Sequence, residues 1–121
     1  MPASLNSTFP PAASITPASS SNKVLVIVNQ NGLEKDNTDT KLGVQLLRST
    51  TVLGIFCSED TLNTSTANRT NVGGTGFSYL DSPSSTSSTE YKTQFKNVGD
   101  GTITIQDGNA VSSITLMEIS G

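Results

Sequence analysis

The stretch Lys23-Val24-Leu25-Val26-Ile27-Val28 decides the fold class of this chain. Every position after Lys23 is apolar, a pattern that indicates a strand covered on both faces. It is also the longest apolar run, and it is far short of the roughly 20 residues that a helix needs to cross a bilayer. We therefore expect a buried strand at 23–28 and no membrane span.

The next two apolar segments, 43–48 and 51–57, are separated by Arg48-Ser49-Thr50. The β-branched residues of the second segment favour two strands, and a short helix at 42–47 is the alternative. Residues 90–96 alternate strictly, which predicts a half-buried strand with one face made by Tyr91, Thr93 and Phe95.

Shorter strands are predicted at 76–80, 102–105 and 112–119, with turn signals at 99–101 and 107–109. The last strand should place Ile114, Leu116 and Glu118 on one face and Thr115, Met117 and Ile119 on the other. Residues 58–75 and 82–88 are expected to be polar loops. Six or seven closely spaced strands without a βαβ rhythm predict an all-β, antiparallel β-sandwich over residues 23–121.

Residues 1–22 differ from the rest because they hold four of the five prolines, which leaves no place for a helix or a central strand. We expect either a disordered tail or an extended N-terminal arm that lies on a neighbouring subunit. In the second case Leu5, Phe9 and Ile15 are the apolar residues that would enter pockets on the partner.

The composition points to a thin core. Hydrophobic residues make up 33 % of the chain, and 35 of its 121 residues are Ser or Thr. A chain of this kind is expected to gain buried surface against partner chains or to remain partly disordered. The net charge of −3 and the scattered Lys and Arg argue against nucleic-acid binding.

The residues for catalysis are scarce. There is no histidine, and the single cysteine, Cys57, is expected to be a buried small hydrophobe rather than a nucleophile. Gly73-Gly74-Thr75-Gly76 lacks the lysine of a phosphate loop. Glu34, Asp36 and Asp39 are Ca²⁺ candidates, for which a solvated polar loop is the preferred interpretation. We expect neither an enzyme nor a protein with a metal or other cofactor.

Glu118 stands between Met117 and Ile119 in an otherwise apolar strand. A buried carboxylate needs a partner, so we expect an ion pair with Arg48 at a subunit interface; an exposed edge position is the alternative. Tyr79 and Tyr91 could stack on a glycan, although core packing explains them better.

The ordered segments 23–28, 44–50, 77–83, 89–95 and 112–119 resemble the C-terminal β-sandwich of many tailed-bacteriophage structural proteins, especially those of cyanophages. The resemblance spans about residues 20–121. It implies a jelly-roll-like fold, a homo-oligomer that is often a trimer, and a place on the virion exterior.

The resemblance leads to two expectations of function. The first is a capsid decoration (cement) protein, made in the host cytoplasm, that binds the major capsid protein at the virion surface through its arm and its sheets. The alternative is a receptor-binding or tail-fibre-tip module that contacts host glycan through the loops at 58–75 and 82–88. No stalk or coiled coil precedes the sandwich, which favours the first.

Overall fold

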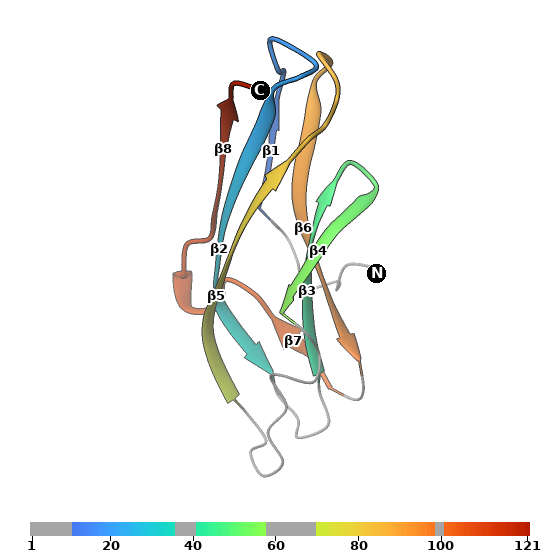
Figure 1. Ribbon diagram of the computed structural model, residues 1–121. Helices are drawn as coiled ribbons and strands as arrows, with labels where there is room; N and C mark the ends of the chain where they lie inside the picture. Colours follow the sequence, from blue (N-terminus) through green and yellow to red (C-terminus); the bar gives the residue numbers. More distant parts are fainter. Residues whose placement is uncertain (1–10, 36–40, 58–69, 99–100) are drawn as a thin grey trace.

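The computed structural model describes residues 11–35, 41–57, 70–98 and 101–121, and these residues form two antiparallel sheets packed face to face (Figure 1). The predicted β-sandwich is therefore confirmed. One sheet, here called the β6 sheet, has the order β1-β6-β3-β4. Its strands are β1 (Ala12–Ile15), β3 (Lys41–Arg48), β4 (Thr51–Cys57) and β6 (Thr89–Val98).

The second sheet, here called the β2 sheet, is built around β2 (Lys23–Lys35). One side of β2 pairs with β5 (Thr70–Asp81). Its other side pairs with β8 (Ser113–Ile119) at the beginning of the strand and with β7 (Ile103–Thr104) at its end. A short 3-10 turn, η2 (Asp107–Asn109), lies between β7 and β8. The apolar segment that opened the sequence thus lies at the centre of its sheet.

The alternating patterns predict the faces correctly. Tyr91, Thr93 and Phe95 of β6 are buried, whereas Lys92 and Gln94 between them are partly exposed. In β2, Val24, Val26 and Val28 point into the core, but Leu25 and Ile27 between them are partly exposed on the outer face. The expectation of a strand covered on both faces is therefore wrong for this chain, because nothing in the described residues packs on the outside of this sheet. The segment at 42–47 is a strand, so the helix alternative is wrong.

Three boundaries differ from the sequence prediction. Strand β2 continues to Lys35, so Glu34 is a buried strand residue and the expectation that it lies in a solvated loop is wrong. Strand β5 begins at Thr70, so residues 70–75 are not part of a loop. This glycine-rich segment can pair closely with β2 because Gly74 has no side chain. A Cβ at that position would collide with the side chain of Asn31. Strand β1 lies inside the segment expected to be an arm, where Pro11 and Pro17 flank a short edge strand, the kind of strand that tolerates proline.

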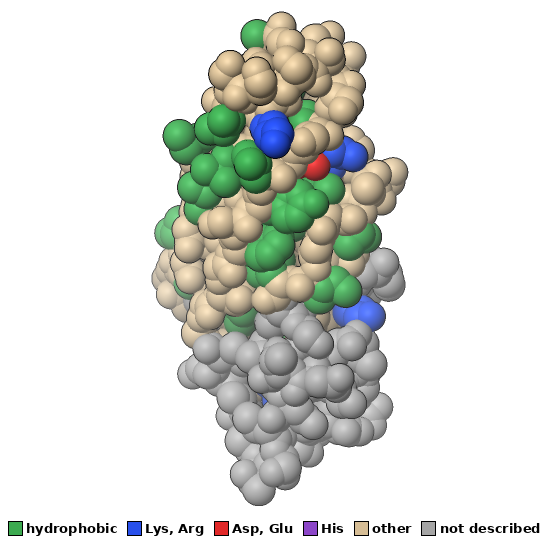
Figure 2. Space-filling model, in the orientation of Figure 1, with side chains coloured by type: hydrophobic (Ala, Val, Ile, Leu, Met, Phe, Trp, Pro, Cys, Tyr) green, Lys and Arg blue, Asp and Glu red, His purple; other side chains and the backbone are tan. Residues whose placement is uncertain are grey.

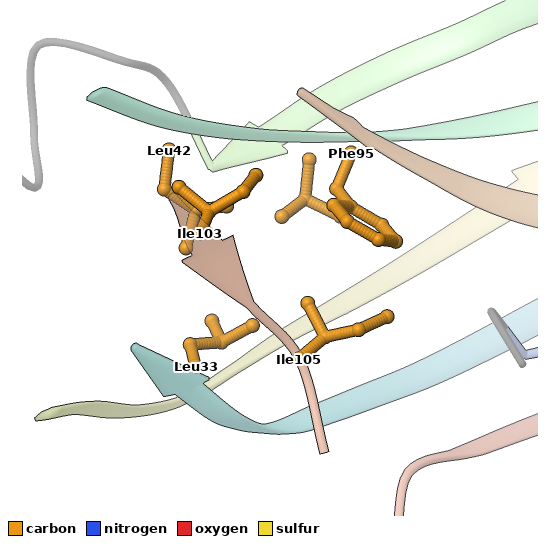
Figure 3. Packing of buried hydrophobic residues seen from close by; sticks show 6 residues of the cluster. Leu33, Leu42, Phe95, Ile103 and Ile105 are labelled. Atoms are coloured by element: carbon orange, nitrogen blue, oxygen red, sulfur yellow. The ribbon is translucent and has the colours of Figure 1, made fainter. Parts of the chain in front are cut away.

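The core consists of two apolar clusters joined by polar contacts. Figure 3 shows Leu33, Leu42, Phe95, Ile103 and Ile105 converging from both sheets in the first cluster. The second cluster contains Val24, Val26, Val28, Leu46 and Tyr91. Near their junction, Thr93 Oγ1 donates to Gln30 Oε1 across the sandwich at 3.2 Å, and Gln30 Nε2 donates to Ser112 Oγ at 3.0 Å. These bonds satisfy a fully buried amide in an apolar setting.

The sheets also approach each other closely at Gly54 of β4. A Cβ added there would lie 2.9 Å from Cζ of Phe77 in β5. The Phe77 ring is stacked on Phe56, with a centroid distance of 5.2 Å. The absence of a side chain at Gly54 therefore lets the two edge strands close this side of the sandwich.

Substitution Gly54→Ala is expected to lower the free energy of unfolding by about 1 to 3 kcal/mol, because the new methyl group overpacks the Phe77 ring. Gly76→Ala is the matched control, since a Cβ there would make only ordinary contacts. Urea denaturation measures both variants, and Phe77→Leu should restore part of the loss in Gly54→Ala. Equal stability of the two single variants would contradict the proposed close approach.

Candidate interaction surfaces

The residues predicted to act at interfaces lie in different parts of the molecule. Leu5 and Phe9 lie outside the described residues. Ile15 belongs to β1 and packs against the chain's own core, next to the cluster that contains Val24 and Tyr91. Ile15 is therefore a residue of the sandwich in this structure, and only residues before Pro11 remain candidates for an arm that reaches a partner.

Arg48 is held by a carboxylate of its own chain. Its Nη1 donates to both carboxylate oxygens of Asp81 at 2.7 Å, and Tyr91 Oη donates to Asp81 Oδ2 at 2.7 Å. Asp81 belongs to the β2 sheet, whereas Arg48 and Tyr91 belong to the β6 sheet. The side chain of Asp81 is 5 % exposed and that of Arg48 is 26 % exposed. These three groups, here called the Asp81 bridge, join the two sheets through charge-assisted hydrogen bonds.

Glu118 has different partners within the chain. Its Oε1 accepts hydrogen bonds from Ala18 N at 2.7 Å and from Asn22 Nδ2 at 2.6 Å. Both bonds lower the pKa of the exposed Glu118 carboxyl, and the bond from Asn22 has the larger effect. The carboxylate thus fixes the turn between β1 and β2 to the last strand. A pair between Arg48 and Glu118 of different subunits stays a prediction, since one chain does not test it.

The other sequence candidates for chemistry are not brought together. Glu34 is buried at the end of β2, and Asp36 and Asp39 lie outside the described residues. Within the part of the chain that the structure describes, no three metal-ligating side chains form a group. Cys57 ends β4, and nothing is described of its side chain. Tyr91 is completely buried and bonded to Asp81, so the idea that it stacks on a glycan is wrong.

A row of apolar side chains crosses the outer face of the β2 sheet. Because directly paired residues share a face, Leu80, Leu25 and Met117 form one row across β5, β2 and β8. Leu80 is 50 % exposed and Met117 is 48 % exposed. On the same face, Ile27 follows Leu25 along β2, and Ile119 follows Met117 along β8. Lys23 is paired with Ile119 at the end of this face. Figure 2 shows hydrophobic side chains gathered at the upper left, over the strands of this sheet.

A hollow lies on the outer face of the β6 sheet. Its volume is about 250 Å³, and it opens to solvent between β3, β4 and β6. The polar lining comes mainly from Gln45, Gln94, Lys92 and the hairpin residues Ser49 and Thr50. Leu47 and Val52 supply its apolar part. Gln45 Nε2 donates to Gln94 Oε1 at 3.1 Å, which holds the two amides in position.

Comparisons with known proteins give no relative for this chain. No protein-family profile matches it, and neither a curated protein nor a solved structure matches it. Among the described residues there is no helix long and apolar enough to cross a membrane.

The sequence alone did not predict the apolar row on the β2 sheet or the hollow on the β6 sheet, because both depend on which strands pair. The alternation in β8 shows that Met117 and Ile119 share a face, but only the pairing of β8 with β2 and of β2 with β5 brings Leu80 beside them. It also missed Asp81, which follows Leu80 at the end of a strand and resembles a turn residue. The signal that could have found it is Arg48, a charged residue that ends an apolar strand and needs a carboxylate if it is partly buried.

The Asp81 bridge predicts how stability changes at high pH. Burial raises the pKa of the Tyr91 hydroxyl, the hydrogen bond to Asp81 and the charge of that carboxylate raise it further, and Arg48 acts in the opposite direction. The pKa of Tyr91 is thus higher in the folded chain than in the unfolded chain, where a tyrosine has a pKa of about 10. The resulting stabilisation is fully present below pH 10 and is lost as the pH rises above that value.

The free energy of unfolding should therefore fall more steeply between pH 10 and pH 11 in the wild-type chain than in Tyr91→Phe, which has no hydroxyl to ionise. At pH 7 the variant should be less stable by about 1 kcal/mol, the usual loss for one hydrogen bond. Urea denaturation at several pH values measures the difference. A difference that stays constant up to pH 11 would show that Tyr91 is not protected by the fold.

Proposed function

We propose that this chain is a bacteriophage capsid decoration protein that binds the outer surface of the capsid lattice and stabilises it. The observation that carries the proposal is the apolar outer face of the β2 sheet. Leu25, Leu80 and Met117 lie side by side across three strands on a chain that already has a closed core of its own. Contiguous exposed apolar surface on a small protein marks an interaction site.

The architecture suits repeated docking rather than chemistry. Both sheets are antiparallel and are joined by the buried Asp81 bridge, so the outer faces are presented by a rigid support. Many weak contacts become strong when a lattice repeats them, because each further contact is made at high effective concentration. The sequence resemblance to phage structural proteins supplies the partner, the major capsid protein, and the place, the virion surface. Association of several copies of the chain belongs to the same proposal.

In this proposal, the segment before β1 makes a second contact with the capsid. The described chain begins at Pro11, whose carbonyl accepts a hydrogen bond from Thr93 N of β6 at 3.1 Å. The described chain therefore begins at the edge of the β6 sheet, and residues 1–10, which precede it in the sequence, contain the apolar residues Leu5 and Phe9. A partner that binds these two residues would add to the contact made by the sheet face.

Deletion of residues 2–10 should leave a folded sandwich, since β1 and the contacts of Glu118 are retained. It should weaken binding to capsids, because only the contact made by the sheet face remains. A deletion up to residue 20 would remove β1 as well and would test folding instead. Co-sedimentation with heads assembled from the major capsid protein of the same genome measures binding, and thermal unfolding by circular dichroism checks the fold. Undiminished binding by the folded truncation would contradict the role of this segment.

The hollow on the β6 sheet supports the second candidate, a receptor-binding module for glycans. Its amides, hydroxyls and the Lys92 ammonium are hydrogen-bonding groups of the kind that hold sugar hydroxyls or carboxylates. Of the loops first considered for this role, 58–69 lie outside the described residues, and 82–88 form the loop between β5 and β6.

Binding to an array of host-surface glycans that Gln94→Ala reduces at least tenfold would favour this second function. Cryo-electron microscopy of the intact virion separates the two candidates independently. A decoration protein should be present in many copies on every capsid facet. A few copies at the tail would contradict that function and favour the receptor-binding one.

A further inference from the structure

Three edges of the sandwich carry features that hinder pairing with another strand. Strand β1 is only four residues long and is flanked by Pro11 and Pro17. The pairing of β4 with β3 is interrupted by two register shifts. Strand β5 pairs with β2 through two further register shifts near Gly73. Short length, prolines and bulges are the devices by which proteins protect sheet edges.

Strand β8 has none of these features. All seven of its residues pair with β2 in one continuous register, from Ser113 opposite Asn29 to Ile119 opposite Lys23. It contains no proline, glycine, lysine or arginine. Its single charged side chain, Glu118, is held by Ala18 and Asn22. No strand among the described residues lies on the side of β8 that faces away from β2. A regular edge of this kind offers a row of backbone donors and acceptors to another strand.

We infer that β8 pairs with β8 of a second copy of this chain, antiparallel and about a two-fold axis. In a pairing centred on Leu116 or on Met117, the two Glu118 residues do not face each other, and every directly opposed pair is free of like charges. A two-fold pairing also suits a strand edge chemically, because its donors meet the acceptors of an identical edge.

The pairing would unite the apolar surfaces of the two copies. Met117 lies at the β8 end of the row that continues through Leu25 to Leu80. Joining two β8 strands makes one sheet from two β2 sheets and doubles the apolar face that the proposed function uses. Self-association is a property of the chain alone, so it can be measured without a capsid.

The experiment compares two double variants of the full chain. Thr115→Lys with Met117→Lys places lysines on exposed positions of β8, where they oppose lysines of the second copy in either register. Ser78→Lys with Leu80→Lys is the matched control, because Ser78 and Leu80 pair with the same two β2 residues, Ile27 and Leu25, on the opposite edge. Circular dichroism and thermal unfolding establish that both variants are folded.

Analytical ultracentrifugation over a range of concentrations should give twice the mass of one chain for the wild type. The β8 variant should dissociate, with a dissociation constant at least a hundredfold higher, and the β5 variant should remain dimeric. As a measurement independent of variants, hydrogen exchange of the β8 amides in the wild type should slow as the concentration rises.

Four outcomes would overturn the inference: a wild type that is monomeric at all concentrations, a trimer, dissociation of both variants, or dissociation of neither. A trimer would instead support the assembly that the sequence resemblance implies. Dissociation of both variants would assign the contact to the apolar face rather than to the edge. In each case the capsid-binding experiment still decides the proposed function, because it measures attachment to heads and not self-association.

Discussion

The rest of the structure depends on one buried carboxylate. Asp81 ends β5 in one sheet and accepts hydrogen bonds from Arg48 and Tyr91 of the other. A buried carboxylate without partners would cost several kcal/mol, whereas one held by a guanidinium and a phenol fixes the positions of the groups around it. The Asp81 bridge therefore adds to the apolar contacts of the two sheets a directional contact that sets their distance and register.

Other specific contacts join the two sheets further along the sandwich. Gln30 and Thr93 hydrogen-bond across the core, and Gly54 lets Phe77 approach the facing sheet. Each of these contacts is directional or requires one particular shape, unlike the burial of an aliphatic side chain. A chain with 33 % hydrophobic residues thus gains a defined packing from a few specific contacts between its sheets. Leu80, Met117 and Ile119 are exposed on the outside of the β2 sheet, where they are available to other proteins, and Val52 and Ile55 are exposed on β4 of the other sheet.

The sequence was sufficient for most of the strands after residue 22 and for their inner faces, but not for β1. Alternation in 90–96 and 113–119 follows directly from the two-residue period of a strand, and the continuous apolar run at 23–28 marks the central strand. It was not sufficient for Asp81 or for the row from Leu80 to Met117. These depend on which strands become neighbours, and Leu25, Leu80 and Met117, which are 37 to 92 positions apart in the sequence, meet only through that pairing. Local pattern also misplaced the start of β5, because its glycines are characteristic of loops.

The most direct test of this account is a double-mutant cycle on the Asp81 bridge, with Arg48→Met, Asp81→Asn and the double variant measured by equilibrium denaturation. Because Arg48 and Asp81 bond across the two sheets and Asp81 is buried, the account predicts a coupling free energy of at least about 2 kcal/mol. Additive losses, with a coupling below about 0.5 kcal/mol, would contradict the claim that this bridge fixes one sheet to the other.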